Sequence, residues 1–358
     1  MSSAPMGAPT GARRSDRIDE LASPGFLGDL LGEVREVTGA PLATVGFAGA
    51  RHERLTVTLA SGEHRSLVLK RTEVAADFTA ARTGDTRGRE ALLLEEPALQ
   101  PVWDAFACPY LGFAREEGAI GLLMEDLGPW LLPDVREPLA LEQEETLLRA
   151  LVRLHASFWE APALALPWLA RPAQIAGVLG PECAASAAAL AVLPPPLRDA
   201  VPRGWAAAMR HLPPSVATLL ARPVAEMEEL HRDLPRTLVH GDCKVANYAL
   251  LADGRVAAFD FAMLGAVPPA IEVGWYLAVN ATRLARAREA FLARYRELLR
   301  EARGTDLDDP AWERLVRAAV LAGALMLLWS KALAFEGGAE RAQAEWRWWV
   351  DRLAAMAS

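Results

Sequence analysis

A polar segment enclosed by apolar runs, at residues 237–259, restricts the possible folds more than any other part of the sequence. It reads Thr237-Leu238-Val239, then His240-Gly241-Asp242-Cys243-Lys244-Val245-Ala246-Asn247, and two further apolar runs follow at 248–251 and 256–259. Between those two runs, Ala252-Asp253-Gly254-Arg255 has the composition of a hairpin turn. The order predicts a strand, a loop and a β-hairpin. It places Asp242 and Asn247 on the loop and Asp260 after the last strand, with the three side chains facing one cleft.

The spacing of these three residues matches the needs of phosphoryl transfer from ATP. A carboxylate must orient the attacking hydroxyl, and oxygen ligands must hold Mg²⁺ on the triphosphate. Asp242, Asn247 and Asp260 supply these groups in the order in which kinases carry them. The segment resembles the catalytic motif of the aminoglycoside phosphotransferase, choline kinase and ecdysteroid-kinase-like group of small-molecule kinases. Gly241, where protein kinases carry Arg, points to this group.

The resemblance covers about residues 40–280 and implies a fold, a division of the chain and an activity. The implied fold class is α+β, a bilobal protein-kinase-like fold with an N-lobe of antiparallel sheet plus helix and a mostly helical C-lobe. The expected division is a disordered tail at 1–20, a nucleotide-binding N-lobe at 21–127 and a C-lobe at 128–358 with the catalytic loop and acceptor site. The implied activity is ATP- and Mg²⁺-dependent phosphorylation of a small-molecule hydroxyl group.

The resemblance also gives roles to residues of the motif. Asp242 would orient and deprotonate the hydroxyl, and Asn247 and Asp260 would bind Mg²⁺. Lys244 matches the lysine of the protein-kinase catalytic loop, which offsets charge on the transferred phosphoryl group; a solvated loop lysine is the open alternative. Glu272 stands where relatives place an Asp that braces this loop, and its side chain is longer by one methylene group.

On the nucleotide side, Lys70 ends an apolar run and resembles the strand-three lysine that reaches the α- and β-phosphates. Glu90, at the start of the next predicted helix, is the expected ion-pair partner of Lys70, with Glu95 and Glu96 as rivals. The alternatives are a solvated lysine and a glutamate that interacts with the helix dipole.

Two further segments are expected to contact ATP. The loop Gly46-Phe47-Ala48-Gly49-Ala50-Arg51 should cover the phosphates, because glycines such as Gly49 let backbone N–H groups approach anionic oxygens. The segment 122–128 resembles the hinge between kinase lobes. There the backbone of Glu125 and Leu127 would offer a C=O and an N–H to adenine.

Periodicity predicts most of the remaining elements. Helices are expected at 26–38 and 89–96, strands at 42–47, 55–59, 67–70 and 119–124, and closing helices at 312–335 and 339–355. An apolar stripe at helical spacing over 147–158 contains His155, which is predicted to be a hydrogen-bonded core residue. Six tryptophans between Trp275 and Trp349 are predicted to be core residues, not a cage for a quaternary ammonium group.

Composition excludes several classes of protein. The chain has 358 residues, enough for two lobes, and 52% of them are hydrophobic, which argues against disorder. A net charge of −8 argues against a nucleic-acid partner. Three scattered cysteines and an N-terminus without an apolar core indicate a cytoplasmic protein. The apolar run 318–330 is too short to span a bilayer, so no membrane partner is expected.

Two alternatives remain open. One is an inactive kinase-fold protein with a binding or regulatory role, against which the intact Lys70, Asp242, Asn247 and Asp260 argue. The other is a metal-dependent hydrolase that uses His240, Asp242 and Asp260, but it would need more histidine ligands, and His231 is the sole neighbour in sequence. The resemblance implies an aminoglycoside-, choline- or sterol-like acceptor, with sugars also open, and the oligomeric state is not predicted.

Overall fold

The computed structural model describes residues 11–43, 49–133 and 135–357, and the chain divides into two compact units. The first, here called the sheet unit, contains the chain up to Ala81, Asp85–Pro133 and Ala246–Ala262. The second, the helical unit, contains Arg82–Gly84, Asp134–Val245 and the chain from Met263 onward. After the six-stranded sheet the chain passes from the sheet unit to the helical unit at Pro133, whereas the expected N-lobe ends at residue 127. The segment 246–262, with Asn247 and Asp260, also belongs to the sheet unit.

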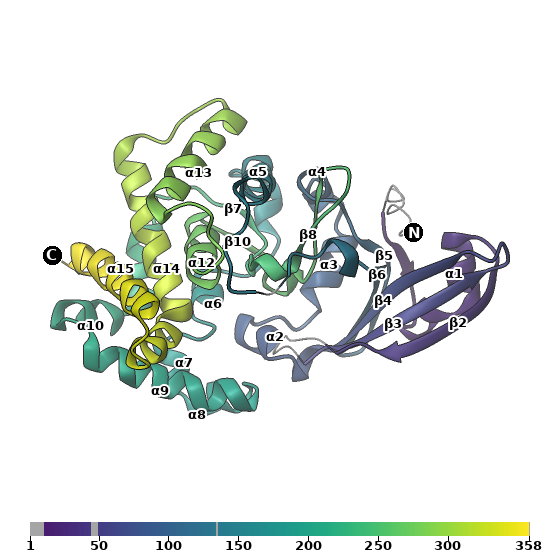
Figure 1. The fold of residues 1–358 in the computed structure, drawn as a ribbon, viewed down its shortest axis with the longest axis horizontal. Helices are drawn as coiled ribbons and strands as arrows, with labels where there is room; N and C mark the ends of the chain where they lie inside the picture. The colour runs from purple at the N-terminus through teal and green to yellow at the C-terminus, as the bar shows by residue number, and fades with distance from the viewer. Residues whose placement is uncertain (1–10, 44–48, 134, 358) are drawn as a thin grey trace. The chain divides into compact units, whose positions relative to one another are not determined.

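In the described part of the sheet unit, six strands form one sheet in the order β1-β5-β6-β4-β3-β2 (Figure 1). β1 pairs in parallel with β5, and the remaining neighbours pair antiparallel. Leu55, Val57 and Leu59 alternate along one strand and face a buried apolar cluster that includes Leu21 and Leu27. The strand bounds are β1 Arg13–Ser15, β2 Val34–Pro41, β3 Arg51–Leu59, β4 His64–Glu73, β5 Tyr110–Glu116 and β6 Ala119–Glu125.

The other elements of this unit frame the nucleotide-side residues. α3 ends before Pro97, as the sequence predicts, because proline disfavours helix in the residue before it. A hairpin of β8 and β9 pairs antiparallel and confirms the predicted turn at 252–255. The bounds are α1 Pro24–Leu31, α2 Phe78–Thr83, α3 Arg89–Glu95, α4 Val102–Ala105, β8 Tyr248–Leu250 and β9 Val256–Ala258.

The predicted helix at 26–38 and strand at 42–47 are wrong in their bounds. The helix stops at Leu31, because Gly32 has φ 100°, and the chain continues as β2 from Val34. Val34 and Val37 continue the helical i, i+3 spacing, which explains the error. In β2 a register shift between Val34 and Glu36 lets both side chains pack against the same apolar cluster. Leu42 and Ala43 lie outside any strand, and residues 44–47 of the predicted strand lie outside the described residues.

Two strands were not predicted. β1 pairs with β5, and Ile18 and Leu21 are buried, so ordered structure begins within the predicted 1–20 tail; residues 1–10 lie outside the described residues. β5 was missed because Tyr110-Leu111-Gly112-Phe113-Ala114 is buried throughout and shows no alternation of polar and apolar residues.

The helical unit confirms the predicted stripe helix and the two closing helices, and adds α13. Several of its helices begin with proline at the first position, where the missing N–H costs no hydrogen bond. β7 and β10 pair antiparallel. The bounds are α5 Leu141–Ser157, α6 Pro172–Ala176, α7 Pro181–Ala185, α8 Ala187–Ala191, α9 Pro195–His211, α10 Pro214–Leu220, α11 Pro223–His231, β7 Thr237–Val239, β10 Gly265–Val267, α12 Ala270–Val279, α13 Arg288–Arg303, α14 Asp309–Glu336 and α15 Glu340–Ala357.

A close contact between α12 and α14 organises the centre of the helical unit. A Cβ atom on Gly274 would lie 2.0 Å from the carbonyl oxygen of Ala319, and one on Gly323 would lie 2.5 Å from that of Gly274. The backbones therefore approach as only glycine permits. α14 is long and apolar enough to cross a membrane by length and composition, but 67% of its most apolar window is buried in the protein. That burial is typical of a core helix, and four of the six C-terminal tryptophans are buried as well.

Candidate active site

Lys70 lies near the end of β4 and forms two ion pairs within the sheet unit. Its Nζ is 2.7 Å from Oε2 of Glu90 on α3 and 2.8 Å from Oδ1 of Asp260. The second oxygen of Glu90 accepts a hydrogen bond of 2.7 Å from the Tyr110 hydroxyl. The structure therefore brings together three predicted site residues far apart in sequence, and adds Tyr110, which the sequence analysis missed.

The protonation states of this cluster follow from burial and charge. Burial alone would lower the pKa of Lys70, but the carboxylates of Asp260 and Glu90 outweigh it and raise the pKa, so Lys70 is an ammonium ion at neutral pH. Burial, with the negative charge of Glu90, raises the pKa of Tyr110 well above its ordinary value. Tyr110 therefore keeps its proton, and its hydroxyl donates a hydrogen bond to Glu90.

The rival acidic residues have other partners. Glu95 is 2.7 Å from the guanidinium of Arg115 on β5. Glu96 accepts a hydrogen bond from the backbone N–H of Ala98 and caps the turn after α3. Of the three candidates, Glu90 is thus the one that pairs with Lys70.

Asp260 adopts an unusual backbone conformation. Its φ is 66°, in the left-handed region that few residues other than glycine adopt. Its N–H donates to Oε1 of Glu90 at 3.1 Å and to the Tyr110 hydroxyl at 3.3 Å. Such strain persists where surrounding contacts impose it and is concentrated at functional sites. Glu90 and Tyr110 thus hold the backbone N–H of Asp260, and Lys70 holds its side chain.

Asn247 and Asp260 lie at the same end of the β8–β9 hairpin. Asn247 precedes β8, Asp260 follows β9 by two residues, and the N–H of Phe259 donates to the carbonyl of Asn247 at 3.3 Å. A carboxylate and an amide oxygen are hard ligands of the kind Mg²⁺ prefers, with water and phosphate completing the shell. The donor set therefore fits Mg²⁺. Over residues 11–43, 49–133 and 135–357 there is no group of three or more His, Cys, Asp or Glu side chains placed to hold a metal.

Gly49, Ala50 and Arg51 are the described part of the predicted phosphate loop; Gly46, Phe47 and Ala48 lie outside the described residues. A Cβ on Gly49 would lie 3.3 Å from the carbonyl oxygen of Ala76, a tight fit. The buried carboxyl group of Asp77 has backbone hydrogen bonds from Gly49 and Ala80, and its burial raises its pKa. Asp77 thus ties the end of this loop to the start of α2, a contact with no signal in the sequence.

The predicted hinge is held by Asp126. Its carboxylate accepts hydrogen bonds from Arg54 at 2.9 Å, Ser66 at 2.7 Å and the N–H of Gly128 at 3.0 Å. The N–H of Glu125 donates to the carbonyl of Pro109, and the carbonyl of Leu127 accepts from the two N–H groups at 130 and 131. Leu127 is buried in an apolar cluster with Ala107, Ala249, Leu251 and Ala257. The backbone of the hinge is therefore fixed within the sheet unit.

In the helical unit, both oxygens of the Asp242 carboxylate have donors. The indole Nε1–H of Trp275 donates to Oδ1 at 2.9 Å, and Nζ of Lys244 lies 3.1 Å from Oδ2. The N–H of Asp242 donates to Nδ1 of His240 at 3.2 Å, a hydrogen bond within the loop itself. Lys244 is 35% exposed and interacts directly with the predicted base.

Glu272 on α12 braces the loop despite its extra methylene group. Oε1 accepts from the N–H of Gly241 at 2.9 Å, and Oε2 accepts from that of His240 at 3.3 Å. Oε2 also lies 2.8 Å from Nε2 of the fully buried His155, whose Nδ1 is 2.8 Å from the Tyr295 hydroxyl. Gly241 has φ 85°, and a Cβ there would lie 2.2 Å from the carbonyl oxygen of Met263, so this position requires glycine.

Asn280, directly after α12, also fixes the loop backbone. Its side chain donates to the carbonyl of Cys243 at 3.0 Å and accepts from the N–H of Val245 at 2.9 Å. The sequence analysis did not identify Asn280, which is buried directly after α12. Cys243 itself is buried, and burial raises the pKa of its thiol, with Glu272 adding to the effect. A nucleophilic thiolate is therefore disfavoured.

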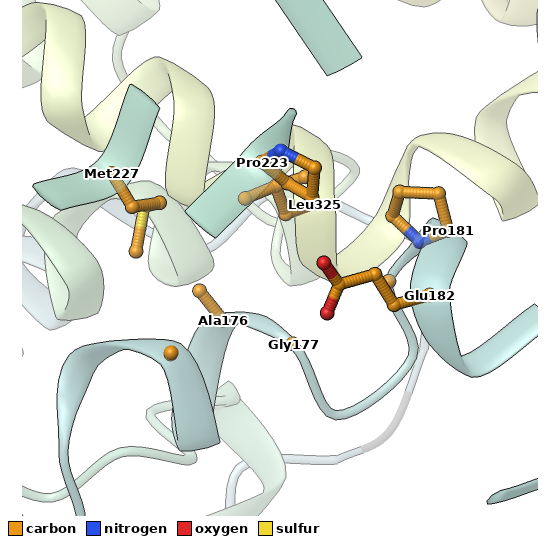
Figure 2. Close-up of a pocket in the computed structure, with 9 residues that line it drawn as sticks. Ala176, Gly177, Pro181, Glu182, Pro223, Met227 and Leu325 are labelled. Carbon is orange, nitrogen blue, oxygen red and sulfur yellow. The ribbon is translucent and has the colours of Figure 1, made fainter. Parts of the chain in front are cut away.

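A pocket elsewhere in the helical unit lies between α6, α7, α11 and α14. Figure 2 shows the Glu182 carboxylate among mostly apolar lining residues that include Pro181, Met227 and Leu325. None of the predicted site residues lines this pocket.

Comparison with known proteins identifies the class. The family model described as the phosphotransferase enzyme family, APH, matches residues 46–315, more than half of the chain, and the protein belongs to this family. The resemblance seen in the motif is thereby confirmed. No curated protein matches the sequence.

Solved structures of low sequence identity are similar over most of their length. Choline kinase LicA from Streptococcus pneumoniae is 13% identical, with 92% of this chain and 97% of that one covered and a TM-score of 0.48. Aminoglycoside phosphotransferase APH(3'')-Id from Streptomyces rimosus, in complex with ADP and streptomycin, is 19% identical, with 85% and 98% covered and a TM-score of 0.41. An ethanolamine kinase from Plasmodium vivax is 13% identical, with 92% and 84% covered and a TM-score of 0.46. Assignment to the family rests on the family model.

Proposed function

We propose that this phosphotransferase transfers the γ-phosphoryl group of ATP to a hydroxyl group of a small molecule in a Mg²⁺-dependent reaction. The observation that carries the proposal is Lys70 paired with both Glu90 and Asp260. In kinases, a lysine–glutamate pair and a metal-binding aspartate must both be in place for catalysis. Membership of the phosphotransferase family supports the same activity.

The nucleotide-side roles follow from the geometry of the sheet unit. Lys70 would contact the α- and β-phosphates as a point charge held by Glu90. Asp260 and Asn247 would hold Mg²⁺, which when bound offsets negative charge on the phosphates. Gly49 would present its backbone to the phosphates, and the backbone of Glu125 and Leu127 would contact adenine.

The chemical step is assigned to the catalytic loop. Asp242 would orient the acceptor hydroxyl and take its proton. The hydroxyl oxygen would form a bond to the γ-phosphorus of ATP. The bond from that phosphorus to the β–γ bridging oxygen would break, and ADP would be released. Lys244 would offset charge on the transferred group. Glu272 and Asn280 hold the loop backbone and so would keep Asp242 in place.

The acceptor is proposed by class alone, as a small molecule with a free hydroxyl group. Choline, ethanolamine, streptomycin and hygromycin B form a suitable first panel, because solved structures similar to this chain are named as choline and ethanolamine kinases or contain these antibiotics. The three cysteines are free, which agrees with a reducing compartment, and we propose a cytoplasmic location.

Calorimetry on two metal-ligand variants tests the proposal. Asp260→Ala should abolish the Mg²⁺-dependent part of ATP binding, whereas Asn247→Ala should weaken it less, because a carboxylate is a stronger ligand of a hard cation than a neutral amide. The titrations are run with Mg²⁺ and with EDTA. Arg13→Ala, which removes an exposed cation of the same unit outside the predicted ATP contacts, is the control and should bind as wild type. ATP binding by the wild type that does not depend on Mg²⁺ would refute the metal assignment.

A further inference from the structure

Trp275 connects α12, the helix that carries Glu272, to the Asp242 carboxylate of the catalytic loop. It lies on α12 and is 9% exposed, and its Nε1–H donates to Oδ1 of Asp242 at 2.9 Å. Glu272 stands three residues earlier on the same helix, so both side chains project from one face. Glu272 fixes the backbone of the loop, and Trp275 contacts the carboxylate itself.

The donor is held rigidly. Gly274, the residue before Trp275, touches the backbone of α14, where a Cβ would lie 2.0 Å from the carbonyl oxygen of Ala319. α12 therefore has little freedom to shift or rotate against α14. A donor on such a helix keeps its position while the loop carries out chemistry.

An indole and an ammonium act differently on a carboxylate. The indole N–H donates one hydrogen bond, carries no charge and accepts none, so it restricts rotation of the carboxylate without competing for the proton. Lys244 supplies a charge, but it is 35% exposed and sits on the same loop as Asp242. Trp275 is thus suited to orient the carboxylate of the proposed base. Preorganisation of a catalytic group raises the rate of the chemical step.

We infer that Trp275 is a positioning residue that fixes the orientation of the Asp242 carboxylate for proton abstraction; the inference rests on the proposed phosphoryl transfer. Trp275→Phe keeps an aromatic ring and removes the N–H. We expect kcat to fall about 10-fold, because one hydrogen bond to a charged group is lost, while the KM for ATP stays unchanged.

The assay measures ADP release from MgATP with water as the acceptor, so it does not depend on the identity of the natural acceptor. The matched control is Trp349→Phe on α15, which removes an indole N–H bond of 2.9 Å to Glu345 from a ring that is also buried. Trp349→Phe should leave kcat and KM as in wild type. Equal kcat losses in the two variants would overturn the inference.

A double-mutant cycle separates positioning from general damage. If Trp275 acts through Asp242, the double variant Trp275→Phe/Asp242→Asn should be as slow as Asp242→Asn alone. Independent structural damage would instead multiply the two losses and overturn the inference. Failure of the proposed function looks different: Asp242→Asn would then turn over like wild type, or wild type would release no ADP.

Discussion

The sheet unit and the helical unit hold their predicted site residues in different ways. In the sheet unit the residues are held by ion pairs, because Lys70 lies between the carboxylates of Glu90 and Asp260. In the helical unit, the backbone of the catalytic loop is held by Glu272 and by the neutral amide of Asn280. Under the proposed function, the ion pairs in the first unit would be redistributed on binding of phosphate and Mg²⁺. The backbone hydrogen bonds in the second would not need to change.

The largest expected effect is on the base. Asp242→Asn should lower kcat by about 10³-fold, because general base catalysis typically contributes 10²–10⁴-fold and the amide cannot take the proton. The fold should survive, since the amide oxygen still accepts from Trp275 and the braces on the backbone are unchanged. Steady-state kinetics and the thermal unfolding midpoint measure the two effects. Near-normal turnover would remove Asp242 from the mechanism.

Removing the cation from the sheet unit should cost stability. Lys70→Met leaves the buried carboxylate of Glu90 without its counter-ion and should lower the free energy of unfolding by about 3 kcal/mol. Lys244→Met should lower it by less than about 1 kcal/mol, because that pair is partly exposed. Urea unfolding of both variants compares the units directly. Equal losses would show that the two units do not differ in this respect.

The helical unit should instead be sensitive to acid through His231. Burial lowers the pKa of this imidazole to about 4, whereas the unfolded value is about 6.5. The unfolded state therefore binds the proton first, and the stability present above pH 6.5 is lost as the pH falls towards 4. At pH 5 the loss should be about 2 kcal/mol. Urea unfolding at pH 7.5 and pH 5 measures it, and His231→Leu should show a pH dependence smaller by that amount; an unchanged dependence would contradict the assignment.

The smallest effect distinguishes the two lysines. Lys244→Ala should lower kcat about 10-fold with little change in the KM for ATP, since a cation that meets the phosphoryl group during transfer stabilises the transition state. Lys70→Ala should also raise the KM for ATP, because Lys70 would contact phosphates in the bound complex. Steady-state kinetics of both variants decide this. An unchanged kcat for Lys244→Ala would leave Lys244 as a solvated loop lysine.

The proposed site residues stand out in the sequence, as do two of their supporting partners, Glu90 and Glu272, whereas Tyr110, Trp275 and Asn280 do not. The order of Asp242, Asn247 and Asp260 is set by the reaction and by a local hairpin, so the spacing survives in the sequence. Tyr110 and Trp275 reach the site through packing of elements far apart in the chain, and an isolated Tyr or Trp has no pattern that marks it.

The errors in the fold have a similar origin. The segment 26–38 is a helix followed by a strand, and its apolar residues keep the helical i, i+3 spacing across Gly32, where the helix ends. β5 is buried over its first five residues and lacks alternation. Local pattern was therefore sufficient for β3, α5 and the buried β6, and insufficient for β5 and for the change of conformation at Gly32.

The late position of the β8–β9 hairpin in the chain has a consequence for synthesis. Ala107 and Leu127 are buried against Ala249, Leu251 and Ala257, which lie more than a hundred residues further on. At typical translation rates the ribosome needs on the order of ten seconds to add the missing hairpin. During that time Ala107 and Leu127 lack the partners that bury them in the finished sheet unit, so this apolar cluster can be completed only after residue 257 has been made.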